Sequence, residues 1–90
     1  MLTYDLSGHG KIPMYEYLYQ MIRDDILAGR VKKDEKLPSK RTLAEHLSVS
    51  KITVENAYAQ LLAEGYIYSR EKKGYFAEDM GSFDFHAERE

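Results

Sequence analysis

The chain has 90 residues, of which 43% are hydrophobic, with a formal net charge of -2 and no cysteine. This length suits one small domain with its own core, and the lack of cysteine excludes disulfides and thiolate metal sites. There is no run of about 18 apolar residues and no signal-peptide pattern, so we expect no membrane contact and a cytoplasmic location.

The charge is distributed unevenly along the chain. Residues 30–51 contain seven Lys or Arg against three Asp or Glu, whereas residues 78–90 contain five acidic side chains against one Arg. A polyanion responds to the local field within about one Debye length, roughly 8 Å at physiological salt, more than to the formal total. The negative total therefore does not exclude a nucleic-acid binder.

Residues 1–11 contain two glycines and show no sustained hydrophobic period, so we expect a flexible leader. A helix is predicted from Pro13 to Ala28, because proline suits a first helical turn and Gly29 can end the helix. The apolar residues of this helix share one face, which we expect to be buried. They are Tyr15, Leu18, Tyr19, Ile22 and Ile26.

Residues 38–65 contain two helical patterns. The first follows a potential N-cap at Ser39 and is about two turns long, and the second runs from Lys51 to Glu64 after an N-cap at Ser50. The apolar residues of the second recur as on one buried helical face. They are Val54, Ala57, Tyr58, Leu61, Leu62 and Gly65. Residues 48–49 leave room only for a tight turn, which predicts a helix-turn-helix although the usual turn glycine is absent.

After these helices, YIYSR alternates, EKKG suits a turn and YFAE resumes an extended pattern, which together predict a β-hairpin. Ile67 and Phe76 are expected in the core, and Gly74 is expected where unusual backbone angles are needed. Lys72 and Lys73 lie at the hairpin tip. The predicted fold class is mainly α with a small β-hairpin, a winged helix-turn-helix of three helices plus a wing.

The string LPSKRTLAEHLSVSKITVENAYAQLLAEGYI resembles the winged helix-turn-helix DNA-binding domain of the GntR family of bacterial transcription regulators. Within the family, AYAQLLAEGYIYS and the MLTYDL opening are most similar to the MocR subgroup, and the YtrA-like subgroup is the alternative. The resemblance implies a DNA-binding domain at residues 12–78 and a linker at residues 79–90 to a C-terminal effector domain outside this chain.

In the MocR subgroup, that effector domain is aminotransferase-like. The resemblance therefore implies no cofactor in this chain and places any pyridoxal phosphate in the absent domain. It also implies a homodimer of the full-length protein and an effector ligand bound by the absent domain. The sequence contains no P-loop, GxSxG or HExxH, and His86 lacks partners for closed metal coordination, so we expect neither an enzyme nor a metal site.

The candidate DNA contacts form three groups. The segment 51–64 is expected to be the recognition helix in the major groove, with its polar face outward opposite the buried one. The start of the preceding helix approaches the phosphates, and the wing at residues 71–74 meets the backbone or the minor groove. The candidate residues are Ser39, Lys40, Arg41, Ser50, Lys51, Ile52, Thr53, Glu55, Asn56, Lys72, Lys73 and Gly74.

Two of these residues can be compared with the family pattern, and two more have alternative roles that follow from their side chains. By resemblance, Arg41 matches a DNA-contacting arginine, and Lys51 stands where an arginine is usual. Because lysine is a flexible point charge and arginine a two-pronged donor for guanine, base discrimination is weaker or shifted here. Glu55 accepts from a cytosine amino group, pairs with a lysine or repels wrong sites. Asn56 pairs with adenine or is merely exposed.

Two classes of function fit this pattern. The first is sequence-specific binding of double-stranded DNA by a transcription regulator, with phosphate contacts supplying most of the affinity. The alternative is a winged-helix protein-interaction module that binds no DNA. A salt titration on duplex DNA separates them, because only a DNA reader binds the duplex and loses affinity steeply as salt rises.

Overall fold

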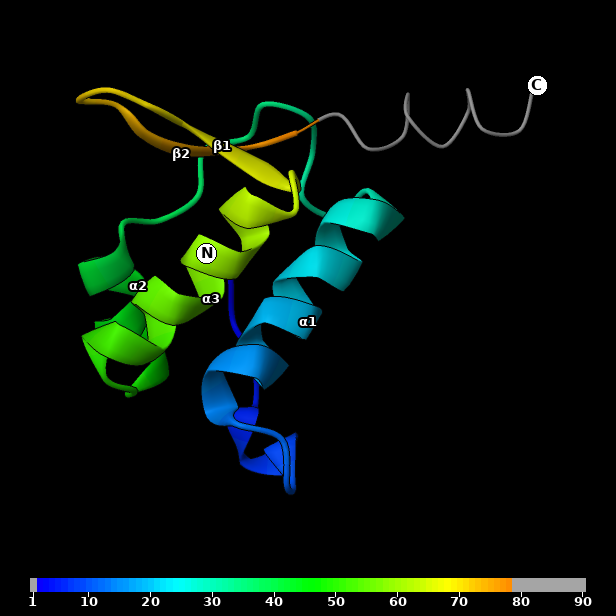
Figure 1. Cartoon of the computed structure of the whole chain (residues 1–90), viewed down its shortest axis with the longest axis vertical. Helices are drawn as coiled ribbons and strands as arrows, with labels where there is room; N and C mark the ends of the chain where they lie inside the picture. Colours follow the sequence, from blue (N-terminus) through cyan, green and yellow to red (C-terminus); the bar gives the residue numbers. More distant parts are fainter. Residues whose placement is uncertain (1, 79–90) are drawn as a thin grey trace.

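The computed structural model describes residues 2–78. In chain order, its elements are η1 (Leu6–His9, a 3-10 helix), α1 (Met14–Ala28), α2 (Lys40–Leu47), α3 (Lys51–Ala63), β1 (Ile67–Arg70) and β2 (Gly74–Ala77). Helix α3 lies between α1 and α2 and packs against both, and the hairpin of β1 and β2 lies across one end of the helices (Figure 1). This arrangement confirms the predicted winged helix-turn-helix. The linker predicted at residues 79–90 lies outside the described residues.

Helix α1 forms where its sequence predicts. Pro13 occupies the N-cap position, and Gly29 ends the helix with a left-handed φ of 85°. Four of its five predicted face residues are buried, namely Leu18, Tyr19, Ile22 and Ile26. None of the helices within residues 2–78 has the length and apolar character needed to cross a membrane.

The helix-turn-helix is fixed by its two serine caps. The Ser39 hydroxyl oxygen accepts from the Thr42 N–H at 3.1 Å, and the Ser50 hydroxyl oxygen accepts from the Thr53 N–H at 3.2 Å. Each cap stabilises its helix by about 1 kcal/mol. Between the helices, Ser48 takes a left-handed φ of 59°, so a serine supplies the conformation for which such turns usually use glycine.

The core is centred on α3. Its Val54, Ala57, Tyr58 and Leu61 are buried against α1 and α2, as predicted. The other two residues of the predicted face are not buried, because Leu62 is partly exposed and Gly65 is exposed beyond the end of the helix. The Tyr58 hydroxyl donates to the Pro38 carbonyl oxygen at 2.8 Å, and its burial raises the pKa of this phenol. This bond joins α3 to the residue just before α2 and satisfies a polar group inside the core.

The hairpin register shows which strand residues face the core. Ile67 pairs with Ala77 and both are buried, whereas the next pair, Tyr68 and Phe76, lies on the opposite face. The expectation that Phe76 enters the core is wrong, because successive strand residues alternate between faces. Phe76 instead stacks on Tyr68, with 5.6 Å between ring centroids, and the Arg70 guanidinium lies over both rings.

The connector before α2 adds a short third partner to the hairpin. Lys36 forms an isolated bridge with Phe76, and the Leu37 N–H donates to the Tyr75 carbonyl at 2.8 Å. At the other end of β2, the Ala77 N–H donates to Glu35 and the Ala77 carbonyl accepts from Asp34. The Glu78 N–H donates to Tyr66 at 2.9 Å. The last residues of β2 are therefore held from both sides.

The N-terminal segment differs from the flexible leader that we expected. Leu6 is only 6% exposed and belongs to the core, with Leu2 and Tyr4 packed against it. The Tyr4 hydroxyl donates to Asp25 at 2.6 Å, and Thr3 hydrogen-bonds to His46. This correction has a simple cause: residues 2, 4 and 6 are apolar at alternate positions, so an extended segment turns all three toward the domain.

Candidate nucleic-acid interface

The N-terminal half of α3 presents the outward face predicted from its periodicity. Lys51, Ile52 and Asn56 are exposed, and Thr53 and Glu55 are partly exposed. Ile52 stands out because it is 64% exposed, more than Leu27, the other exposed large hydrophobic residue within residues 2–78. An apolar side chain and an amide thus share this face with charged groups.

The cations near the starts of α2 and α3 each form an ion pair with a glutamate one turn further along the same helix. Lys51 Nζ lies 3.9 Å from a Glu55 carboxylate oxygen, and Arg41 Nε lies 3.7 Å from Glu45. Of the three roles considered for Glu55, the structure shows pairing with a lysine. Such exposed pairs are weak, so either cation can turn to a stronger anion nearby. Glu55 nevertheless lowers the positive field at the start of α3.

The capping serines are already engaged within their helices. Ser39 donates its hydroxyl hydrogen to the Thr42 hydroxyl oxygen at 2.8 Å, and the Ser50 and Thr53 hydroxyls lie 2.9 Å apart. Ser39 and Ser50 therefore act first as structural caps. The helix starts still carry unpaired backbone N–H groups and the positive end of the helix dipole, which favour an anion near Lys40.

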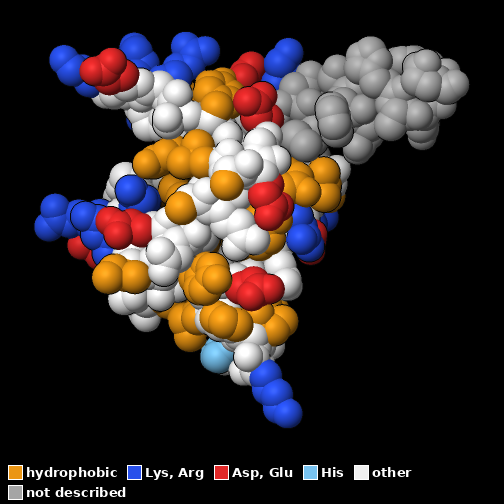
Figure 2. All heavy atoms as spheres, viewed as in Figure 1, with side chains coloured by type: hydrophobic (Ala, Val, Ile, Leu, Met, Phe, Trp, Pro, Cys, Tyr) orange, Lys and Arg blue, Asp and Glu red, His pale blue; other side chains and the backbone are white. Residues whose placement is uncertain are grey.

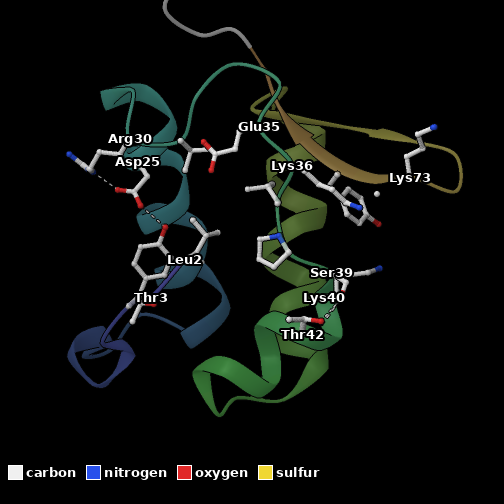
Figure 3. A pocket seen from close by; sticks show the side chains of 16 residues that line it. Leu2, Thr3, Asp25, Arg30, Glu35, Lys36, Ser39, Lys40, Thr42 and Lys73 are labelled. Atoms are coloured by element: carbon white, nitrogen blue, oxygen red, sulfur yellow. Dashed lines mark hydrogen bonds and ion pairs between the residues drawn. The ribbon is translucent and has the colours of Figure 1, made fainter.

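A groove of about 950 Å³ brings the wing next to the start of α2 (Figure 3). Lys40 and Lys73, which are 33 positions apart, line the same end of it, together with Lys36. Lys40 Nζ lies 5.6 Å from the centre of the Tyr75 ring. The opposite end carries Asp25, which accepts from Arg30 Nε at 2.6 Å. One end of the groove is therefore a concentration of positive charge.

Lys36 was not among the predicted site residues. Its Cε lies 3.3 Å from the position that a Cβ on Gly74 would take, so its side chain runs close over the base of the wing. The bridge between Lys36 and Phe76 places it there. The signal in the sequence is Leu37, an apolar residue at the end of a charged connector, because a short strand there also aligns the preceding lysine with the hairpin.

The wing tip has an unusual backbone. Gly74 has a φ of 116°, in agreement with the unusual backbone angles predicted for it, and Lys72 has a left-handed φ of 66°. A left-handed conformation costs a non-glycine residue about 1–2 kcal/mol. The Lys73 N–H donates to the Arg70 carbonyl at 2.9 Å, which closes the turn. Lys72 and Lys73 are both exposed at this tip.

Of the predicted residues, those that line the groove come from the start of α2 and from the wing, namely Ser39, Lys40, Lys73 and Gly74, whereas the predicted α3 residues are not among its lining. Figure 2 shows Lys and Arg side chains projecting from the hairpin and from the side where α2 and the start of α3 lie. Within residues 2–78, no cluster of three or more His, Asp or Glu is arranged to hold a metal ion. The features that the described residues do offer are a groove with a cationic end, between the wing and the start of α2, and an exposed face on α3.

Comparison with known proteins relates this arrangement to transcription regulators. The family model for bacterial regulatory proteins of the gntR family matches residues 14–76. The uncharacterized HTH-type transcriptional regulator YdeL of Bacillus subtilis (strain 168) is 50% identical over 78 residues, which are 87% of this chain and 17% of YdeL. The probable rhizopine catabolism regulatory protein MocR of Rhizobium meliloti is 49% identical over 69 residues, 77% of this chain and 14% of MocR. The chain therefore spans a small part of the length of these relatives.

Solved structures share the fold. YtrA from Sulfolobus acidocaldarius, a GntR-family transcription factor, superposes with a TM-score of 0.77 at 29% identity, covering 96% of this chain and 97% of that one. The DNA-binding domain of AraR in complex with operator ORE1 gives a TM-score of 0.70 at 25% identity, covering 86% and 98%. MocR and YtrA both occur among the similar proteins, so the comparisons show the family without singling out a subgroup.

The matched region contains α1, α2, α3 and most of the wing. Its relatives are regulators and its fold is that of their DNA-binding domains, not of an enzyme. This chain therefore belongs to the gntR family of bacterial regulatory proteins, and it carries the family's winged helix-turn-helix DNA-binding domain.

Proposed function

We propose that this chain binds one half-site of an operator in double-stranded DNA. The N-terminal half of α3 enters the major groove, the starts of α2 and α3 hold phosphates, and the wing contacts the backbone or the minor groove. One observation carries this proposal: the outward α3 face from Lys51 to Asn56 is open to solvent, and Lys36, Lys40 and Lys73 converge from separate elements on a groove between the wing and the start of α2.

Different residues of this surface make different kinds of contact with DNA. Lys40, Arg41 and Lys73 supply attraction to phosphates that does not depend on sequence, and this attraction gives most of the affinity. Side chains on α3 supply the contacts to base edges, which give specificity. Lys72 and Lys73 extend the phosphate contacts to the wing tip, where the hydrogen bond from the Lys73 N–H to the Arg70 carbonyl closes the turn.

A salt titration with matched arginine variants tests this assignment. The chain is first used to select a duplex from a random-sequence library, and binding to that duplex is measured by fluorescence anisotropy between 50 and 200 mM salt, a range over which a protein with several phosphate contacts loses roughly 10³ in affinity. Arg41→Ala should weaken binding and reduce the slope of log K against log salt by about 0.9, the value of one released phosphate contact.

The matched control is Arg23→Ala. Arg23 is partly exposed and is also paired with a neighbouring acid, Asp24 at 3.1 Å, but it lies on α1, on the far side of α3 from α2 (Figure 1). This variant should keep the wild-type slope. Equal slopes for both variants would remove Arg41 from the interface, and failure to select any duplex would favour a protein-interaction module.

We further propose that the full-length protein follows the MocR arrangement, with an aminotransferase-like domain after this one. The identity to MocR and the AYAQLLAEGYIYS string support this proposal. Pyridoxal phosphate needs a lysine and a partner for its pyridinium nitrogen. The described lysines are exposed, apart from the partly buried Lys40, and no charged residue is buried, so residues 2–78 do not fit the cofactor. The following domain would hold it.

The same proposal covers assembly and regulation. The following domain would bind the effector and pair two chains, so that two half-sites are read together in the cytoplasm. The reading frame beyond Glu90 tests the subgroup, because an aminotransferase-like continuation supports it and a short helical continuation indicates a YtrA-like protein. Sedimentation of the full-length protein tests the dimer, and a single-chain mass would contradict it.

A further inference from the structure

Ile52 is an exposed apolar side chain near the start of α3. It is the second residue of α3, it is 64% exposed, and it faces outward between Lys51 and Thr53. A single exposed isoleucine needs no explanation by itself. Its position in the first turn of the helix proposed to enter the major groove is what gives it meaning.

The neighbours of Ile52 limit what α3 can read. Helix α3 contains no arginine, and its only cation, Lys51, lies 3.9 Å from the Glu55 carboxylate. In the commonest specific contact in the major groove, a cationic side chain donates two hydrogen bonds to guanine. Helix α3 has no arginine for this contact, and its lysine is paired with Glu55. Asn56 is exposed one turn after Ile52, on the same side of the helix. Its amide matches the donor and acceptor of adenine.

We propose that Ile52 selects thymine by packing against its 5-methyl group, and that Asn56 reads an adenine close by. This inference rests on the proposed DNA-binding function and adds the class of base that α3 selects. The methyl group is displayed only in the major groove and only by thymine. One helical turn rises about 5.4 Å and one base pair about 3.4 Å, so the two bases lie within about two base pairs.

The test removes one methyl group from the DNA and one side chain from the protein. Each thymine of the selected duplex is replaced in turn by deoxyuracil, which keeps the base-pairing edge and lacks the methyl group. At one thymine of the half-site, the wild-type chain should bind about fourfold more weakly, the value of one buried methyl-sized group. Ile52→Ala should bind the thymine duplex more weakly and show no further loss with deoxyuracil there.

Two variants keep the result interpretable. Leu27→Ala removes, on α1, the other exposed large hydrophobic side chain of residues 2–78, and should keep the wild-type ratio of thymine to deoxyuracil binding. Ile52→Val keeps a branched apolar group and should retain part of that ratio. Circular dichroism checks that each variant is folded, which we expect because both positions are exposed.

The outcomes separate the inference from the function on which it rests. If a duplex is selected but Ile52→Ala remains as sensitive to deoxyuracil as the wild type, the thymine contact is overturned and DNA binding stands. A selected half-site without A·T pairs overturns it equally. If no duplex is selected at all, the proposed function itself fails.

Discussion

Replacing Glu55 with glutamine should strengthen binding to duplex DNA. Glu55 holds Lys51 at 3.9 Å, and two unit charges about 4 Å apart in water attract by about 1 kcal/mol before salt screening. The substitution keeps the shape of the side chain, removes a negative charge from the α3 face and frees Lys51 for a phosphate. We expect affinity to rise by up to about fivefold, which corresponds to about 1 kcal/mol.

The salt dependence gives a second measure of the same change. If Lys51 gains one phosphate, the slope of log K against log salt should steepen by about 0.9. Loss of the pair costs the helix only about 0.3–0.5 kcal/mol, which a urea titration can check. Asp24→Asn is the matched control, because it breaks a similar pair with Arg23 on α1 and should leave DNA affinity unchanged.

Weaker binding by Glu55→Gln would refute this reasoning. It would mean that the carboxylate accepts a hydrogen bond from a base, such as the amino group of cytosine. The ion pair with Lys51 would then be broken in the complex. Such a result would be confined to the selected duplex. On duplexes of unrelated sequence, the neutral side chain would still bind more tightly.

Three further predictions concern stability. Leu6→Ala should lower the free energy of unfolding by about 2–5 kcal/mol in a urea titration, because Leu6 is buried; a loss below about 0.5 kcal/mol would contradict its place in the core. Tyr58→Phe should cost about 1 kcal/mol by the same assay, since it removes the bond to Pro38. The Tyr19 hydroxyl lowers the pKa of Glu64, so this contribution is complete above about pH 4.3 and is lost as pH falls through the folded pKa. Tyr19→Phe should therefore flatten the acid side of the stability curve, and an unchanged curve would count against the bond.

The helix-turn-helix could be predicted because its signals are local. The serines at positions 39 and 50 can cap only the helices that follow them, and the period of α3 identifies its buried side without knowledge of its partners. The outward direction of Lys51 to Asn56 follows from the same period. Its use in DNA binding does not, because periodicity describes a surface and not what covers it.

The features that were missed depend on pairing between distant segments. Phe76 faces outward because Ile67 pairs with Ala77. A shift of the pairing by one residue would turn Phe76 to the other face, and neither strand alone shows which pairing forms. Lys36 reaches the wing through a bridge across 40 positions. The packing of Leu6 was signalled by an alternation too short to distinguish from chance, and its partners lie on other elements.

The hydrogen bonds around Ala77 and Glu78 have a mechanical consequence. The chain leaves the hairpin at the end opposite the wing tip, and there its backbone is bonded to Asp34, Glu35 and Tyr66. A pull from a domain attached after Glu78 would act first on these bonds, which join the chain to the connector before α2 and to the residue before β1, and not on Lys73 at the wing tip. Such a domain would turn the whole reading unit as one rigid body and leave the shape of its wing unchanged.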